Sequence, residues 1–329
     1  MRPETLFDRA DADWPLFGLV DDVRPALAAI LEGARPGALA TLVAVDGPSP
    51  RPVGAQMAIA PDGKAAGCVS GGCVEGSVAI IGREVASQGA PRLVVFGAGS
   101  PYLDIKLVCG SRIEVFIERA APEDETLRAV VEAREARRSM VRTVTRAGCA
   151  AVEPPDRRRG ALAGVEGDVV WRRYDPPTRL MIFGGDPVAL ATAQLGLAAG
   201  METILVRRLG PQSAPVNIAD DYLAMAPDDA LAETPPDAWT AIVTTTHDLD
   251  EDHECLERAL PSPAFYVGAL GSRRRLADRI AKLERAGLPW DAIRRLRAPV
   301  GMDIGAATPM EIALSILAEI VCAQRRAGA

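Results

Sequence analysis

The second half of the chain alternates short apolar runs with helical segments, and this alternation restricts the possible folds more than any other feature. Strands separated by helices form a parallel sheet with right-handed crossovers. The sequence therefore predicts a Rossmann-like parallel-sheet domain of the α/β class at residues 177–329. The predicted strands are 179–183, 202–206, 241–245 and 264–267, with a helix at 188–199 between the first two.

The first half predicts a smaller α+β domain at residues 1–176, which ends in the sequence Asp175-Pro176-Pro177. A segment rich in Gly and Pro, 154–167, is expected to be an exposed loop. At the other end of the chain, Thr308 and Glu311 have the spacing of a capping box ahead of a long helix. The predicted strands of the first half are 38–45, 56–60, 65–68, 92–97, 112–118 and 140–145, and the predicted helices are 22–32 and 123–138.

Charge and hydropathy exclude several classes of function. The net charge of −7 is spread along the chain without a basic face, which argues against nucleic acid as a ligand. No run of about eighteen apolar residues occurs, and the first residues are rich in Arg and Asp, so we expect no membrane span and a cytoplasmic location. Six cysteines in such a chain are not expected to form disulfides.

The stretch G-C-V-S-G-G-C-V-E-G, residues 67–76, combines two thiols, a hydroxyl, a carboxylate and four glycines. A helical pattern follows it, so the stretch should lie at a helix N-terminus, where anions and thiolates are favoured and a thiol pKa is lowered. Too few histidines and the wrong cysteine spacing argue against a closed zinc site. The candidate residues are Cys68, Ser70, Gly71, Gly72, Cys73 and Glu75.

Two residues outside the stretch are further candidates. Arg51 follows Ser49 in a proline-rich loop and could pair with a phosphate or carboxylate, or be a solvated loop arginine. Cys109 is a third thiol that could return to the same surface, or a buried cysteine before a turn.

The dinucleotide fingerprint in the second half is damaged. After the first strand the sequence reads F-G-G-D-P-V-A, with Asp186 where a second glycine would let the backbone approach a diphosphate. The second strand ends in Arg207 and Arg208, without the carboxylate that holds ribose hydroxyls. Two interpretations stay open, NADP binding and a Rossmann-like scaffold without a dinucleotide.

Two other positions in this half could carry function. His247 follows a predicted parallel strand and could be an acid/base group, a metal ligand together with His253, or a loop histidine. Gly271, Ser272 and Arg273 lie between a strand and a helix, where they would form either an anion-binding cradle or only a tight turn.

Taken together, these motifs resemble the XdhC/CoxI family of xanthine dehydrogenase accessory proteins over most of the chain. The resemblance rests on G-C-V-S-G-G-C-V-E and on the segment 37–57 in the first half, and on T-T-H-D, Y-V-G-A-L-G-S-R-R-R and the segment 301–320 in the second. It departs at Gly184-Gly185-Asp186-Pro187, where relatives tend to read G-A-G-H, and at Leu249, where many relatives carry a second histidine.

The resemblance implies a chaperone that binds the molybdenum cofactor, as molybdopterin or its cytosine dinucleotide. Such a protein supports sulfuration of the cofactor, with a cysteine desulfurase as a candidate partner, and delivers it to an apo molybdenum hydroxylase. It also implies a homodimer. Cys68 and Cys73 would be candidate molybdenum ligands, with Cys109 as a third thiol, and Arg51 would meet the anionic parts of the cofactor.

Two functions from other classes compete with this interpretation. One is an NAD(P)-dependent oxidoreductase that uses the Rossmann-like domain, which Asp186 argues against. The other is a scaffold that binds only protein partners through its final helix.

Overall fold

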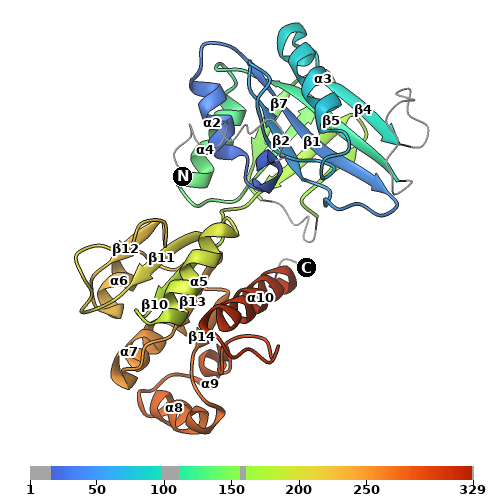
Figure 1. Cartoon of the computed structure of the whole chain (residues 1–329). Helices are drawn as coiled ribbons and strands as arrows, with labels where there is room; N and C mark the ends of the chain where they lie inside the picture. The colour runs from blue at the N-terminus through green and yellow to red at the C-terminus, as the bar shows by residue number, and fades with distance from the viewer. Residues whose placement is uncertain (1–15, 98–110, 156–160, 328–329) are drawn as a thin grey trace. The chain divides into compact units, whose positions relative to one another are not determined.

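The computed structural model describes residues 16–97, 111–155 and 161–327, and the chain divides into two compact units, Met1–Pro176 and Pro177–Ala329 (Figure 1). Each unit has its own sheets and its own hydrophobic core. The first unit contains the cysteine-bearing stretch, and the second contains the parallel sheet.

A five-stranded antiparallel sheet forms the centre of the first unit, in the order β3-β2-β1-β5-β4. Side chains alternate along each strand, so successive residues point to opposite faces of the sheet. Different helices cover the two faces. Ala38 and Ala40 pack with α3, whereas Leu39 packs with α2 and α4. The elements are α2 (Arg24–Glu32), β1 (Gly37–Asp46), β2 (Gln56–Ile59), β3 (Ala65–Gly67), α3 (Glu75–Gln88), β4 (Arg92–Gly97), β5 (Arg112–Ala120) and α4 (Glu125–Glu135).

A second antiparallel sheet completes the first unit, in the order β7-β6-β9-β8. Its strands are β6 (Met140–Thr145), β7 (Ala150–Glu153), β8 (Ala163–Glu166) and β9 (Val169–Tyr174). The prediction of an exposed loop over 154–167 is therefore wrong at its end, where β8 pairs with β9. The hairpin turns at Gly167, whose φ of +61° suits a glycine.

The second unit confirms the predicted Rossmann-like fold. The six strands of its sheet are parallel. They lie in the order β12-β11-β10-β13-β14-β15, in which the direction of the chain across the sheet reverses between β10 and β13. Separate core clusters pack on its two faces. The strands are β10 (Arg179–Phe183), β11 (Glu202–Val206), β12 (Asp221–Leu223), β13 (Thr240–Thr244), β14 (Tyr266–Ala269) and β15 (Leu296–Arg297).

Six helices connect or follow these strands: α5 (Pro187–Ala198), α6 (Pro227–Glu233), α7 (Leu249–Ala259), α8 (Arg273–Arg285), α9 (Trp290–Ile293) and α10 (Pro309–Ala327). The predicted capping box of α10 is confirmed, because Glu311 Oε2 accepts the Thr308 N–H at 2.9 Å and Thr308 Oγ1 accepts the Glu311 N–H at 3.3 Å. In the part of the chain that the structure describes, no helix combines the length and the apolar character that a membrane span needs.

Candidate functional site

The loop between β3 and α3 folds around the carboxylate of Glu75, the first residue of α3. Glu75 Oε1 accepts the N–H groups of Val69 at 3.0 Å and Ser70 at 2.7 Å. Its Oε2 accepts the Ser70 hydroxyl at 2.7 Å and the N–H groups of Gly72 at 2.9 Å and Val74 at 3.2 Å. The carboxylate is buried, so these five hydrogen bonds replace its hydration shell.

The Ser70 hydroxyl also binds backbone groups of the same loop. Its Oγ accepts the N–H groups of Cys73 at 3.1 Å and Val74 at 3.0 Å. Burial raises the pKa of the Glu75 carboxyl, but hydrogen bonds from Ser70 and from the backbone lower it by more, and the net pKa lies below its ordinary value. The N–H groups expected to meet an anionic ligand therefore bind a carboxylate of the chain itself, which makes the loop rigid.

Two glycines show how the loop is built. Gly67 has φ +85°, and a Cβ there would lie 2.3 Å from the backbone oxygen of Gln56, so β3 can enter the loop only through a glycine. Gly72 has φ +116°, and a Cβ there would have no neighbouring atom within 4 Å, so its backbone is open to an approaching ligand. The open position lies directly before Cys73.

The two cysteines of the loop are in different environments. Cys73 is exposed, whereas Cys68 is only 5% exposed. The Cys68 thiol donates to the backbone oxygen of Gly18 at 3.5 Å, and Gly18 belongs to the 3-10 helix η1 (Leu16–Leu19), which covers it. Of these two thiols, Cys73 is the one that a ligand can reach directly.

The expected lowering of a thiol pKa is wrong for Cys68. Burial raises the pKa of the Cys68 thiol, and the charges of Glu75 and Asp21 raise it further. The charge of Arg51 and the Gly71 N–H act in the opposite direction but do not outweigh burial. Cys68 is therefore held as the neutral thiol, which is a poor metal ligand and a poor nucleophile.

Arg51 lies at this site but has a partner within the chain. Its Nη2 donates to Asp21 Oδ1, while its buried Nε has no hydrogen-bond partner among the described residues. Ser49 Oγ holds the loop by donating to the Arg51 backbone oxygen at 2.9 Å. The pairing of Arg51 with a ligand phosphate or carboxylate stays a prediction.

The structure brings most of the predicted site of the first unit together. Pro50 contacts the loop as well, since a Cβ on Gly71 would lie 3.1 Å from its Cγ. Cys109 lies outside the described residues. The residues gathered around the loop are Arg51, Cys68, Ser70, Gly71, Gly72, Cys73 and Glu75.

In the second unit, Asp186 fills the position where a dinucleotide would place its diphosphate. It caps α5 by accepting the Ala189 N–H at 2.7 Å, and it also accepts the Thr245 hydroxyl at 3.0 Å. The side chain of Arg207 packs across the neighbouring glycine, because a Cβ on Gly185 would lie 2.4 Å from its Cδ. A negative charge at the switch point between β10 and β13 repels a diphosphate.

The two histidines have different partners. His247 is 84% exposed in its side chain, and its Nε2 lies 3.5 Å from Asp186 Oδ2. His253 Nε2 lies 2.6 Å from Glu257 Oε1 one helical turn away, and burial lowers the pKa of this imidazole. Within the described ranges, no group of three or more His, Cys, Asp or Glu side chains is placed to hold a metal ion. The described residues therefore do not form a metal site that contains both His247 and His253.

Gly271, Ser272 and Arg273 form the turn from β14 into α8. Ser272 is the N-cap of α8 but makes no capping hydrogen bond with its side chain, and the first turn of the helix contains no acid. Arg273 is exposed and faces Asp303 at 3.8 Å. Both predicted roles, an anion cradle and a tight turn, are compatible with this geometry, and the cradle stays a prediction.

Sequence reasoning missed the residues that surround the loop from other segments. Gly18 covers Cys68, and Asp21 binds Arg51. Ser111 donates to the backbone oxygen of Pro48 in the proline-rich loop. No local pattern marks these contacts, because each joins segments that are far apart in the sequence.

Comparison with known proteins identifies the family. The XdhC and CoxI family matches residues 30–97, and the XdhC Rossmann domain matches residues 180–320. The molybdenum cofactor insertion chaperone PaoD of Escherichia coli strain K12 is 34% identical over 307 residues, which are 92% of this chain and 89% of that protein. This chain belongs to the XdhC and CoxI family.

Two further relatives match nearly the whole chain. A probable xanthine dehydrogenase subunit of Bacillus subtilis strain 168 is 27% identical over 326 residues, covering 91% of this chain and 97% of its own. A crystal structure described as a xanthine dehydrogenase from Bacillus halodurans has a TM-score of 0.74 and 25% identity, covering 93% of this chain and 96% of that one. The resemblance seen in the motifs is confirmed, and the cysteine loop lies within the range that matches the XdhC and CoxI family.

A substitution of Glu75 tests its structural role in this XdhC-family loop. Glu75→Gln should lower the free energy of unfolding by about 3 kcal/mol at pH 7, because the amide leaves N–H donors unsatisfied. The pKa of Glu75 is lower in the folded protein than in the unfolded chain, where it is 4.5. The stabilisation by the Glu75 carboxylate is therefore fully present above pH 4.5 and is lost as the pH falls through the pKa of the folded state. Urea denaturation at several pH values measures it, with Glu84→Gln on the exposed side of α3 as the control. Equal stability of Glu75→Gln and wild type at pH 7 would contradict the role.

Thiol reactivity tests the different exposure of the two cysteines. With a thiol reagent and peptide mapping by mass spectrometry, Cys73 should react on the order of a hundred-fold faster than Cys68. Asp21→Asn should raise the Cys68 rate several-fold, because it frees Arg51 and removes a negative charge. Asp62→Asn, an exposed acid paired with Lys64 elsewhere in the unit, should leave both rates unchanged. Equal rates for the two wild-type thiols would show that η1 does not protect Cys68.

Proposed function

We propose that this protein is a molybdenum cofactor chaperone, which binds the cofactor as cargo and delivers it to an apo molybdenum hydroxylase of the xanthine dehydrogenase type. The similarity to PaoD over nine tenths of the chain supports this class of function. The observation that carries the assignment of the site is the exposed Cys73 thiol on a loop made rigid by Glu75.

The chemistry of this loop fits such a cargo. Sulfur is a soft ligand of the kind that binds molybdenum, and the Cys73 side chain is exposed, so a ligand reaches it without the chain opening. Gly72 has no side chain and no neighbouring atom where one would lie, so a bulky ligand can approach the sulfur closely. The loop is already ordered by Glu75 and Ser70, so binding costs little further ordering.

The anionic parts of the cofactor need cationic or N–H partners as well. Arg51 has a buried Nε without a partner among the described residues, and its contact with Asp21 is an exposed ion pair of low strength. An anionic ligand could therefore compete with Asp21 for this guanidinium. A separate candidate position for an anion lies in the second unit, at the N-terminus of α8 with Gly271, Ser272 and Arg273.

A finer proposal concerns sulfur. Cys73 could accept a sulfane sulfur from the persulfide of a cysteine desulfurase, with the desulfurase thiolate as the leaving group. The chain would then hold the sulfur close to the cofactor that requires it. Cys68, kept neutral by burial, is poorly suited to this step.

The competing nicotinamide-dependent oxidoreductase is disfavoured by the second unit itself. Asp186 caps α5 where the diphosphate would bind, and β11 is followed by arginine rather than by a carboxylate for the ribose.

Cofactor retention tests the proposal. The full-length protein is loaded with molybdenum cofactor without oxygen and passed through gel filtration, and molybdenum and pterin are then quantified per chain. Cys73→Ala should lower retention on the order of ten-fold or more, because it removes the exposed sulfur ligand. Cys149→Ala, also exposed but outside the loop, should retain as much as wild type.

A second readout separates the alternatives. In Cys73→Ala, activation of an apo molybdenum hydroxylase should be lower than in wild type, in line with the lower retention of cofactor. In Cys149→Ala, activation should be unchanged. If Cys73→Ala retains no cofactor yet activates the client as well as wild type, the protein is a scaffold for its client. Wild-type protein that neither retains the cofactor nor activates the client would overturn the proposal.

A further inference from the structure

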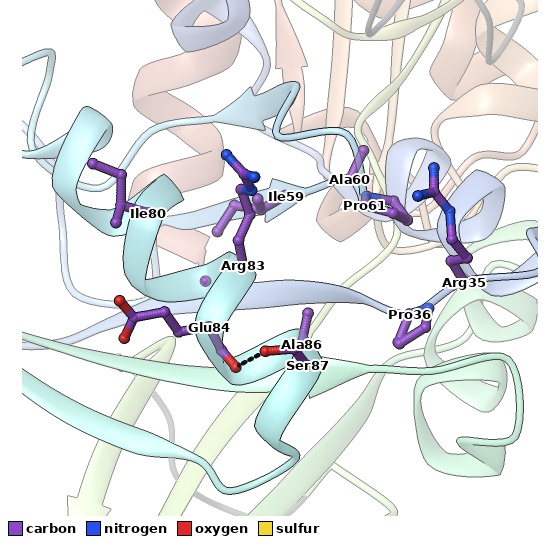
Figure 2. Close-up of a pocket in the computed structure, with 11 residues that line it drawn as sticks. Arg35, Pro36, Ile59, Ala60, Pro61, Ile80, Arg83, Glu84, Ala86 and Ser87 are labelled. Atoms are coloured by element: carbon purple, nitrogen blue, oxygen red, sulfur yellow. Dashed lines mark hydrogen bonds between the residues drawn. The ribbon is translucent and has the colours of Figure 1, made fainter.

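A pocket of about 640 Å³ lies in the first unit, on the side of α3 near its C-terminal half and away from the cysteine loop at its N-terminus (Figure 2). It is formed by α3, by the end of β2 with the turn that follows, and by the segment before β1. None of these residues belongs to the site described above. Its lining comprises Arg35, Pro36, Ile59, Ala60, Pro61, Ile80, Gly82, Arg83, Glu84, Ala86 and Ser87.

The pocket is positively charged within an acidic protein. Arg35 and Arg83 are exposed, and neither has an ion pair or hydrogen bond among the described residues. The acid in the lining, Glu84, is neutralised by Arg92, whose Nη1 lies 2.7 Å from its Oε2. The local balance is therefore two unpaired positive charges, in a chain whose net charge is −7. Carboxylates are the natural partners of exposed arginines.

Apolar surface lies between the two charges. Figure 2 shows the guanidinium groups on the same side of the pocket, one extending from α3 and one from the segment before β1, with the half-buried Ala60 and Pro61 between them. Ile80 adds to this surface, because its side chain is 62% exposed on α3. Ile80 lies one helical turn before Arg83, so a partner at this surface would meet apolar area and positive charge together.

The floor of the pocket is firmly built. Gly82 lets α3 approach β2 closely, since a Cβ there would lie 2.5 Å from Ile59 Cδ1. Ile59 and Ala86 are buried, at 0% and 8% exposure. The rim, in contrast, consists of exposed side chains, so a ligand in the pocket would stay open to solvent on one side. Small-molecule sites usually enclose most of their ligand, whereas protein partners lie across open surfaces of this kind.

We propose that this pocket binds a segment of a protein partner in which carboxylate side chains flank an apolar side chain. The apolar side chain packs on Ile80, Ala60 and Pro61, and the carboxylates pair with Arg35 and Arg83. The inference goes beyond the proposed function and does not depend on the cysteine loop, because none of the pocket residues contributes to that loop.

Methyl NMR of the full-length protein tests the proposal directly. The probe is an acetylated, amidated hexapeptide with two central leucines and two acidic residues on each side. Its addition should shift the methyl signals of Ile80 and Ala60, with a dissociation constant on the order of 1 mM. The same peptide with lysines in place of the acids should not shift them. Equal binding of both peptides would overturn the proposal.

Charge-reversed variants locate the binding. Arg35→Glu and Arg83→Glu should each weaken binding of the acidic peptide by about five-fold, as expected for exposed ion pairs. Arg146→Glu, an exposed arginine in the turn between β6 and β7, should leave it unchanged. All three positions are exposed, and unchanged methyl signals elsewhere would show that the variants fold.

Two further outcomes would contradict the proposal. If N-acetylleucine binds with the same affinity as the acidic peptide, the pocket is a small-molecule site and not a protein-docking surface. If the peptide shifts signals that are far from α3 and β2 and leaves Ile80 unchanged, the docking surface lies elsewhere. Retention of molybdenum cofactor is a separate measurement, so either proposal can fail without the other.

Discussion

The carboxylate of Glu75 accepts five hydrogen bonds from the loop that precedes its own helix, and the candidate site depends on this arrangement. A helix N-terminus with glycines before it would ordinarily be an anion-binding site. Here the anion is a side chain of the protein, so the loop is complete before any ligand arrives. The thiol of Cys73 is exposed on this completed loop, and we therefore propose it as the group that meets a ligand.

The same arrangement separates the roles of the two thiols. Five residues apart in sequence, Cys68 and Cys73 look equivalent, yet the loop turns one inward beneath η1 and the other outward. Burial raises the pKa of Cys68, which keeps it neutral. A comparable device operates in the second unit, where Asp186 caps α5 and occupies the usual diphosphate position. In both units, a carboxylate of the chain itself thus accepts N–H groups at a helix N-terminus, where an anion would otherwise be favoured.

Much of the fold could be predicted from the sequence, because the core strands are continuous apolar runs. The bounds of β10 and β11 were predicted to the residue. The short strand β8 was missed because its pairing with β9, and not its composition, makes it a strand.

The candidate site was predictable in part. The cysteine loop was found from its composition, but the role of Glu75 was not, because Ser70 and Glu75 are not spaced as a capping box. The contacts of Gly18 and Asp21 join distant segments, so no local pattern encodes them. The burial of Cys68, which reverses the expected shift of its pKa, is linked to the contact with Gly18 in η1.

We propose that Cys73 is the protein ligand through which this chain holds the molybdenum of its cargo. X-ray absorption at the molybdenum edge, on the loaded protein prepared without oxygen, tests it most directly. The molybdenum should have one more sulfur neighbour in wild type and Cys149→Ser than in Cys73→Ser, because only the last variant removes the exposed thiol of the loop. Identical sulfur coordination in wild type and Cys73→Ser would contradict the claim.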